Sequence, residues 1–142
     1  MITEKDCLKK YGPPQAETNM ILFDVPTELE IGIIPKRIYC NKDIVPVLER
    51  TFRNLIRTGE VRNLITWDGC FNIRGRLHQK NAPYSLHSWG IAIDVNAAWN
   101  RYGHKSTLTP AFVKCFTDAG FEWGGNWKTL DAMHFQLAKL PD

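Results

Sequence analysis

Residues 85–96 read SLHSWGIAIDVN, and the second half of this stretch alternates as a half-buried β-strand does. From Ile91 to Val95 every second residue is isoleucine or valine, whereas Ala92 and Asp94 face the opposite side. The carboxylate of Asp94 therefore points away from the core that the aliphatic residues build. The small side chain of Ala92 beside it leaves room for a ligand or a substrate.

A second segment, residues 130–137, reads LDAMHFQL and repeats this pattern. His134 and Gln136 share one face, and apolar side chains occupy the other. Upstream of the first strand, Gly90 lets the chain bend, so that His87 can return to the pocket beside Asp94.

If the two strands are neighbours, His87, Asp94 and His134 can form a three-ligand metal site. Two imidazoles and a carboxylate, with a fourth position open to water, are typical of catalytic rather than structural zinc. We therefore predict one zinc ion per chain.

Two more residues are candidates for the chemistry of such a site. Asp131 precedes His134 by three residues, in the turn before its strand, and is the candidate general base. Arg74 follows the strand and turn predicted over residues 66–73, and it could face a developing oxyanion, with Arg76 as the competing choice.

Each of these residues also has an ordinary interpretation. A His-x6-Asp spacing is common by chance, Asp131 is also a typical turn residue, and Arg74 could be an exposed cation. His78 and His104 stand in polar surroundings without ligand-like neighbours, so we interpret both as surface residues.

The N-terminal part of the chain predicts short elements. Thr3 is a plausible N-cap for a helix that ends before Gly12, and residues 1–20 are interpreted as a lead-in segment. Residues 20–25 and 31–39 are apolar, β-branched and interrupted by proline, which favours edge strands.

Two helices are predicted more clearly. Apolar residues recur with helical spacing over residues 44–56, with Asn41 as N-cap and Gly59 as the C-terminal stop. Residues 110–119 predict a second helix, with Thr109 as N-cap and proline at its first position.

A further strand is predicted over residues 62–67, closed by a turn at Asp68-Gly69. Helices and strands are thus interspersed, so the predicted fold class is α+β.

Length and composition limit the classes of protein to consider. The 142 residues fit a single domain, and the formal charge of +3 is scattered rather than clustered, which argues against a nucleic-acid binder. The four cysteines form no C-x-x-C pair, so we expect buried, reduced thiols. Neither a signal peptide nor a membrane span is recognisable, so we expect synthesis in the cytoplasm, no membrane insertion and a monomer.

Four stretches together resemble one peptidase family. They are WDGCFNIR from Trp67, SLHSWGIAIDVN, FEWGGNW from Phe121 and DAMHFQ from Asp131. In this order they resemble the zinc D-alanyl-D-alanine carboxypeptidase and L-alanyl-D-glutamate endopeptidase family, over residues 67–137.

The resemblance implies roles for individual residues and a fold. It implies His87, Asp94 and His134 as zinc ligands, Asp131 as general base and Arg74 as substrate or oxyanion contact; Ser85, Trp127 and Gln136 are assigned to substrate binding. It also implies a small α+β fold, similar to the hedgehog and D-Ala-D-Ala peptidase domains, with an antiparallel sheet carrying the site. Two departures are an aspartate at position 131, where many relatives have glutamate, and Gln136, where some carry an acid.

The expected function is hydrolysis of an amide bond in the peptidoglycan stem peptide. Short members of the family without a signal peptide resemble phage endolysins, which reach the wall after release from the host cytoplasm. A lytic role favours the L-alanyl-D-glutamate bond, with D-alanyl-D-alanine carboxypeptidase as the alternative. A zinc-bearing binding module would not need an acid at position 131, and a metallonuclease would need a clustered basic surface.

Overall fold

The computed structural model describes residues 1–142 and confirms an α+β architecture. The three α-helices are α1 (Glu4–Tyr11), α2 (Val45–Thr58) and α3 (Pro110–Thr117). The six strands are β1 (Met20–Asp24), β2 (Arg37–Asn41), β3 (Trp67–Gly69), β4 (Ala92–Val95), β5 (Phe121–Trp123) and β6 (His134–Leu137).

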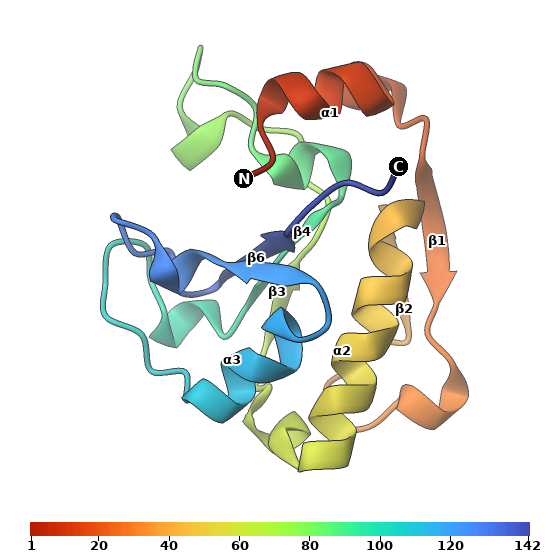
Figure 1. Cartoon of the computed structure of the whole chain (residues 1–142), viewed down its shortest axis with the longest axis vertical. Helices are drawn as coiled ribbons and strands as arrows, with labels where there is room; N and C mark the ends of the chain where they lie inside the picture. The colour runs from red at the N-terminus through yellow and green to blue at the C-terminus, as the bar shows by residue number, and fades with distance from the viewer.

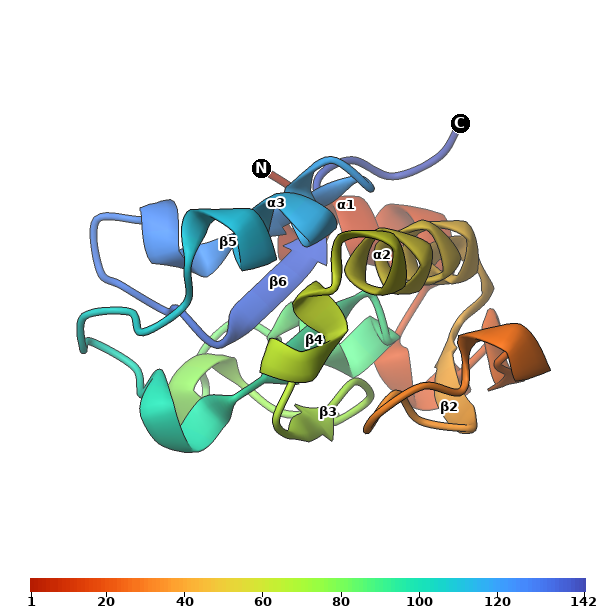
Figure 2. The same ribbon diagram turned by 90° about the horizontal axis from the view of Figure 1, so that it is seen from below.

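The strands form two antiparallel sheets. β1 and β2 make a two-stranded sheet, and the other four strands are ordered β3-β4-β6-β5. Figures 1 and 2 show α2 and α3 on one side of the four-stranded sheet. This arrangement leaves the opposite face of β4 and β6 free to carry polar side chains.

The core lies between α2, α3 and this sheet. Phe116 of α3 stacks on Phe135 of β6 with ring centroids 4.2 Å apart, and Phe52 of α2 is fully buried. Ile93 and Val95 of β4 are also fully buried, as the alternation of that strand predicts. The apolar faces of both central strands are therefore fixed against the helices.

Gly59 ends α2 as predicted, whereas the predicted cap Asn41 caps a 3-10 turn before the helix and not α2 itself. The side chain of Asn41 accepts a hydrogen bond from the Asp43 N–H, and a short 3-10 turn, Lys42–Ile44, leads into the helix. Gly59 ends the helix in the left-handed conformation, with φ 79°.

The helix α3 also begins as predicted. Thr109 accepts a hydrogen bond from the Phe112 N–H, and Pro110 occupies the first turn, where its missing N–H costs nothing. The helix ends at Thr117, two residues before the predicted end.

The N-terminal segment is more than a lead-in. Thr3 and Asp6 form a reciprocal capping box at the start of α1, and Cys7 and Tyr11 are buried in the main core. The Trp89 indole N–H donates to the Gly12 carbonyl at 2.9 Å, which ties the end of this helix to the segment that carries His87.

The strand predicted over residues 62–67 is wrong in its position. Glu60–Asn63 forms a 3-10 helix, and the N–H groups of Ile65 and Thr66 donate to the Asn96 side chain rather than to a strand. The strand begins at Trp67, so Asp68-Gly69 lies in it and forms no turn. A distant asparagine satisfies the backbone there, which periodicity cannot reveal.

The four cysteines are free and buried, as expected. Burial raises the pKa of Cys7 and of Cys40 to about 12. None of the helices combines the length and the apolar character that a membrane crossing requires.

Tyr11 provides a test that α1 belongs to the folded domain. Its hydroxyl donates to Asp43 at 2.7 Å. We expect Tyr11→Phe to lower the free energy of unfolding by about 1–2 kcal/mol, because the hydrogen bond has a charged acceptor. The measurement is urea denaturation followed by circular dichroism. The control is Tyr102→Phe, because Tyr102 is exposed; equal stability of the two variants would contradict the structural role of α1.

Candidate metal centre

A single turn of 3-10 helix, Leu86–Trp89, presents His87 to the centre. The Ser85 hydroxyl caps this turn by accepting from the His87 N–H, and Gly90 ends it with φ 68°. A Cβ at Gly90 would lie 2.8 Å from the Asn41 backbone nitrogen, so no larger residue fits. The predicted bend at Gly90 is confirmed.

The imidazole of His87 is oriented by a backbone carbonyl. Its Nδ1 lies 2.7 Å from the Cys70 carbonyl oxygen and therefore carries the proton that it donates there. The other nitrogen, Nε2, is left unprotonated in the neutral ring and lies 3.2 Å from Asp94 Oδ2. His87 thus turns a lone pair towards Asp94.

Strand pairing brings the second histidine to the same carboxylate. β4 and β6 are antiparallel neighbours, and Asp94 is the direct register partner of His134. His134 Nδ1 lies 3.4 Å from Asp94 Oδ1, while its Nε2 lies 2.9 Å from Gln136 Oε1. A proton on Nε2 satisfies Gln136 and leaves Nδ1 free.

The structure therefore brings together the three residues predicted as ligands. One ligand atom from each of His87, Asp94 and His134 lies within 4.8 Å of the others. His87 Nε2 and Asp94 Oδ1 are buried without a hydrogen-bond partner, which is costly unless another group satisfies them. A cation that accepts lone pairs from two imidazoles and a carboxylate meets this requirement, so the residues fit a zinc ion.

Asp94 and His134 shift each other's pKa values towards the charged forms. Burial alone would raise the pKa of Asp94, but in the metal-free protein protonated His134 and His87 rings can donate hydrogen bonds to it, which lower that pKa well below its usual range. Burial alone would lower the pKa of His134, but its hydrogen bond to Asp94 and the charges of Asp94 and Asp131 raise it. A carboxylate is therefore held ionised between two imidazoles.

Asp131 lies beside the cluster, in the turn that leads into β6. Its N–H donates to the Gly124 carbonyl at 3.0 Å, and its own carbonyl accepts from the His134 N–H. Burial raises the pKa of Asp131, the nearby charge of Asp94 raises it further, and His134 and Arg74 oppose the change. Its carboxylate is thus a stronger proton acceptor than an exposed one.

Gly124 sets the position of Asp131. A Cβ at Gly124 would collide with the backbone carbonyl of Asp131, although the backbone conformation there suits any residue. The WGGNW element therefore brings its backbone against the candidate base, a role that the sequence pattern did not reveal.

Arg74 is placed by Ser88. The Ser88 hydroxyl accepts from the Arg74 N–H and donates to its carbonyl, each at 3.1 Å. The guanidinium Nε is buried without a partner, and Arg74 acts on Asp131 electrostatically. Arg76, the competing choice, is exposed. Arg74 is thus the better buried of the two arginines, and its role as the cation of the centre stays a prediction.

The three residues assigned to substrate binding have structural contacts that sequence analysis did not foresee. Ser85 is buried and caps the turn of His87, and Gln136 is buried against His134. Trp127 is half-buried, with its ring centroid 5.4 Å from that of His134. Their substrate contacts stay predictions. His78 and His104 are exposed and lie outside the cluster, as expected.

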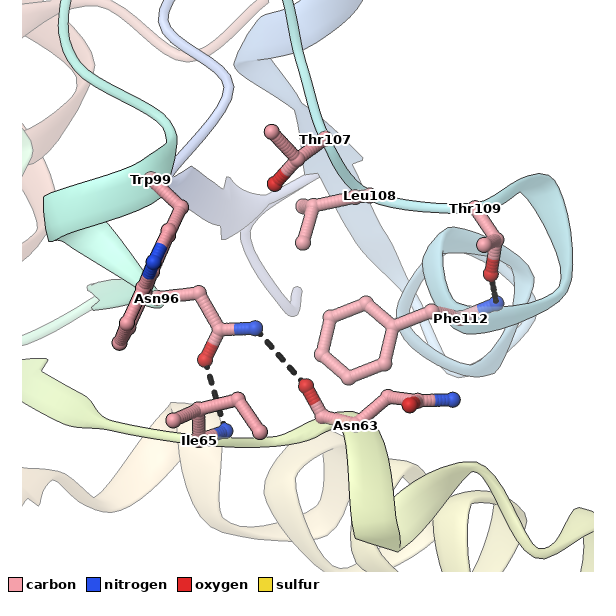
Figure 3. Close-up of a pocket in the computed structure, with 8 residues that line it drawn as sticks. All are labelled: Asn63, Ile65, Asn96, Trp99, Thr107, Leu108, Thr109 and Phe112. Atoms are coloured by element: carbon pink, nitrogen blue, oxygen red, sulfur yellow. Dashed lines mark hydrogen bonds between the residues drawn. The ribbon is translucent and has the colours of Figure 1, made fainter.

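A separate pocket of about 250 Å³ lies between the segment after α2, the turn after β4 and the start of α3. Figure 3 shows Asn96 at its base, linked to Asn63 and Ile65, with Trp99 and Phe112 along its sides. None of the potential ligands lines it. We therefore assign the chemistry to the His-Asp-His cluster.

The first test of the centre is a zinc titration by calorimetry. We expect one Zn²⁺ to bind per chain. Loss of a residue that only hydrogen-bonds to a metal ligand weakens metal binding about 10–100-fold, so we expect His134→Ala, which removes a ligand, to weaken it more. The exposed histidine variant His104→Ala is the matched control. Equal weakening by both substitutions would rule out the cluster as the zinc site.

A second test concerns the placement of Asp131. We expect Gly124→Ala to displace Asp131 and to lower hydrolysis of purified peptidoglycan at least about tenfold, because small misplacements of a catalytic group are costly. Zinc affinity should change less than activity, because His87 and Asp94 come from other segments and His134 is held in β6 by its pairing with Asp94 of β4. Loss of zinc binding in this variant would mean that Gly124 supports the whole centre instead.

Comparison with known proteins points to the same segment of the chain. Residues 78–137 match the family model described as D-alanyl-D-alanine carboxypeptidase. The matched segment contains the His-Asp-His cluster, Asp131 and the WGGNW element, and Arg74 precedes it. Searches of curated proteins and of solved structures returned no significant match. Residues 78–137 are thus similar to the D-alanyl-D-alanine carboxypeptidase family, and the buried His-Asp-His cluster lies within the matched segment.

Proposed function

We propose that the chain is a zinc-dependent L-alanyl-D-glutamate endopeptidase that cuts the stem peptide of peptidoglycan. The observation that carries the proposal is the buried cluster of His87, Asp94 and His134, whose potential ligand atoms lie within 4.8 Å of one another and include two buried atoms without a hydrogen-bond partner. A metal centre with an adjacent acid is the arrangement that hydrolysis of an amide needs.

The three ligands would hold the ion through His87 Nε2, the Asp94 carboxylate and His134 Nδ1, since the other imidazole nitrogens are engaged by Cys70 and Gln136. When bound, zinc supplies Lewis acidity that polarises the scissile carbonyl and acidifies water. The partners of the histidines fix their tautomers, so that the ligand atoms are ready before binding.

Asp131 would move the proton. Its carboxylate takes a proton from the water that attacks the scissile carbonyl carbon, and then delivers that proton to the nitrogen of the leaving amine as the C–N bond breaks. The raised pKa of Asp131 favours both proton transfers, because it brings the pKa of the carboxyl group closer to the pH at which the enzyme works.

Arg74 would hold negative charge on the substrate side. Its backbone is fixed by the Ser88 contacts, and its buried Nε lacks a partner within the protein. A carboxylate of the stem peptide or the developing oxyanion would supply that partner.

The bond that is cut separates two versions of this proposal. Cleavage of the internal L-alanyl-D-glutamate bond severs a link that carries wall load, as an endolysin-type role requires. The similarity to the D-alanyl-D-alanine carboxypeptidase family favours the second candidate, a D-alanyl-D-alanine carboxypeptidase. In either version we infer a monomer, made in the host cytoplasm, that acts on the wall after release.

The decisive experiment is mass spectrometry of purified peptidoglycan after incubation with the zinc-loaded protein. A new N-terminal glutamate is the expected product, whereas release of single D-alanine would establish the carboxypeptidase. Absence of any zinc-dependent product from several wall types would overturn the proposal in favour of a binding module.

Paired variants separate catalysis from folding in this assay. Asp131→Asn should lower the rate at least about 100-fold, the contribution expected of a general base. The control is Asp24→Asn, whose carboxylate is exposed in a surface ion pair. Arg74→Gln should lower the rate while Arg76→Gln leaves it unchanged. A fully active Asp131→Asn would exclude Asp131 as the base.

A further inference from the structure

Trp127 contacts one candidate ligand and shares a backbone hydrogen-bond acceptor with the candidate base. Its ring lies at 49° to the imidazole of His134, with centroids 5.4 Å apart. The backbone N–H of Trp127 donates at 3.2 Å to the Gly124 carbonyl, which also accepts from the backbone N–H of Asp131. The backbone of Trp127 is therefore bonded to the same carbonyl as that of Asp131, and its indole lies against the imidazole of His134.

The direction of this indole depends on Glu122. The Trp127 Nε1 donates to Glu122 Oε2 at 2.8 Å, a charge-assisted hydrogen bond. Glu122 lies on β5 as the direct register partner of Gln136, so both side chains lie on the face of the sheet that carries His134. Glu122 thus contacts Trp127, Trp127 contacts His134, and His134 contacts Gln136. Gln136 is in turn the cross-strand partner of Glu122.

Glu122 forms no ion pair that would explain its position. It is half-buried and takes part in none of the ion pairs of the structure. A carboxylate without a cation at a partly buried position is costly unless a donor satisfies it. The indole N–H is that donor, so the two side chains hold each other.

We propose that Glu122 is a positioning residue of the centre: its carboxylate holds the Trp127 indole against His134 and thereby fixes the wall along which the substrate lies. The kinetic part of this inference rests on the proposed peptidase function, whereas the hydrogen bond and its effect on the indole do not.

Nuclear magnetic resonance tests the positioning without any activity. The chain has five tryptophans, and the Trp127 indole cross-peak is the one that disappears in Trp127→Phe. We expect Glu122→Leu to move this cross-peak upfield, because the carboxylate acceptor is lost, and Glu122→Gln to move it less. The control Glu30→Leu removes an exposed acid and should leave it in place.

Kinetics then tests the consequence for catalysis. We expect Glu122→Leu and Trp127→Phe each to lower kcat/KM about tenfold, the effect of one hydrogen bond to a charged group. The double variant should lose no more than either single one, because both remove the same interaction. Glu122→Gln should recover most of the loss, and zinc stoichiometry should stay at one per chain in all variants.

An unmoved Trp127 cross-peak in Glu122→Leu would overturn the inference, as would losses that add in the double variant. If the wild-type protein cut no peptidoglycan, the proposed function would fail while the cross-peak shift still decided the role of Glu122. The two failures are therefore distinguishable.

Discussion

The antiparallel pairing of β4 with β6 is the constraint on which the rest of the centre depends. It sets Asp94 directly opposite His134, with the aliphatic residues of both strands turned to the helices. A register shift of one residue would turn the polar side chains into the core and the aliphatic ones out. The packing of Phe116 on Phe135 therefore protects the geometry of the centre as well as the stability of the fold.

The remaining parts of the centre are fastened to this pair of strands by backbone contacts. Cys70 orients His87 through its carbonyl, Ser88 clamps the backbone of Arg74, and Gly124 admits Asp131 at close range. Such contacts come from loops and short turns held by a rigid sheet, which is where functional residues concentrate. The result is a buried group of polar atoms that lacks internal partners, an arrangement that a bound cation would stabilise.

The sequence predicts those parts of the fold and of the centre that depend on strand alternation or on residues close to one another in the chain. The alternation around Asp94 and His134 placed the ligands on one face, and Gly59 and Thr109 marked helix ends because each acts within a few residues. The strand near Trp67 was misplaced because Asn96, 30 residues away, satisfies the backbone of Thr66. The sequence predicts Ser85 and Gln136 as substrate contacts, whereas their hydrogen bonds with His87 and His134 exist only in the folded chain.

The most direct test of the central claim is the anomalous scattering of zinc in a crystal of the zinc-loaded protein. The account predicts one strong peak in contact with His87 Nε2, the Asp94 carboxylate and His134 Nδ1. A peak at the exposed His78 or His104, with no density between the three predicted ligands, would contradict it.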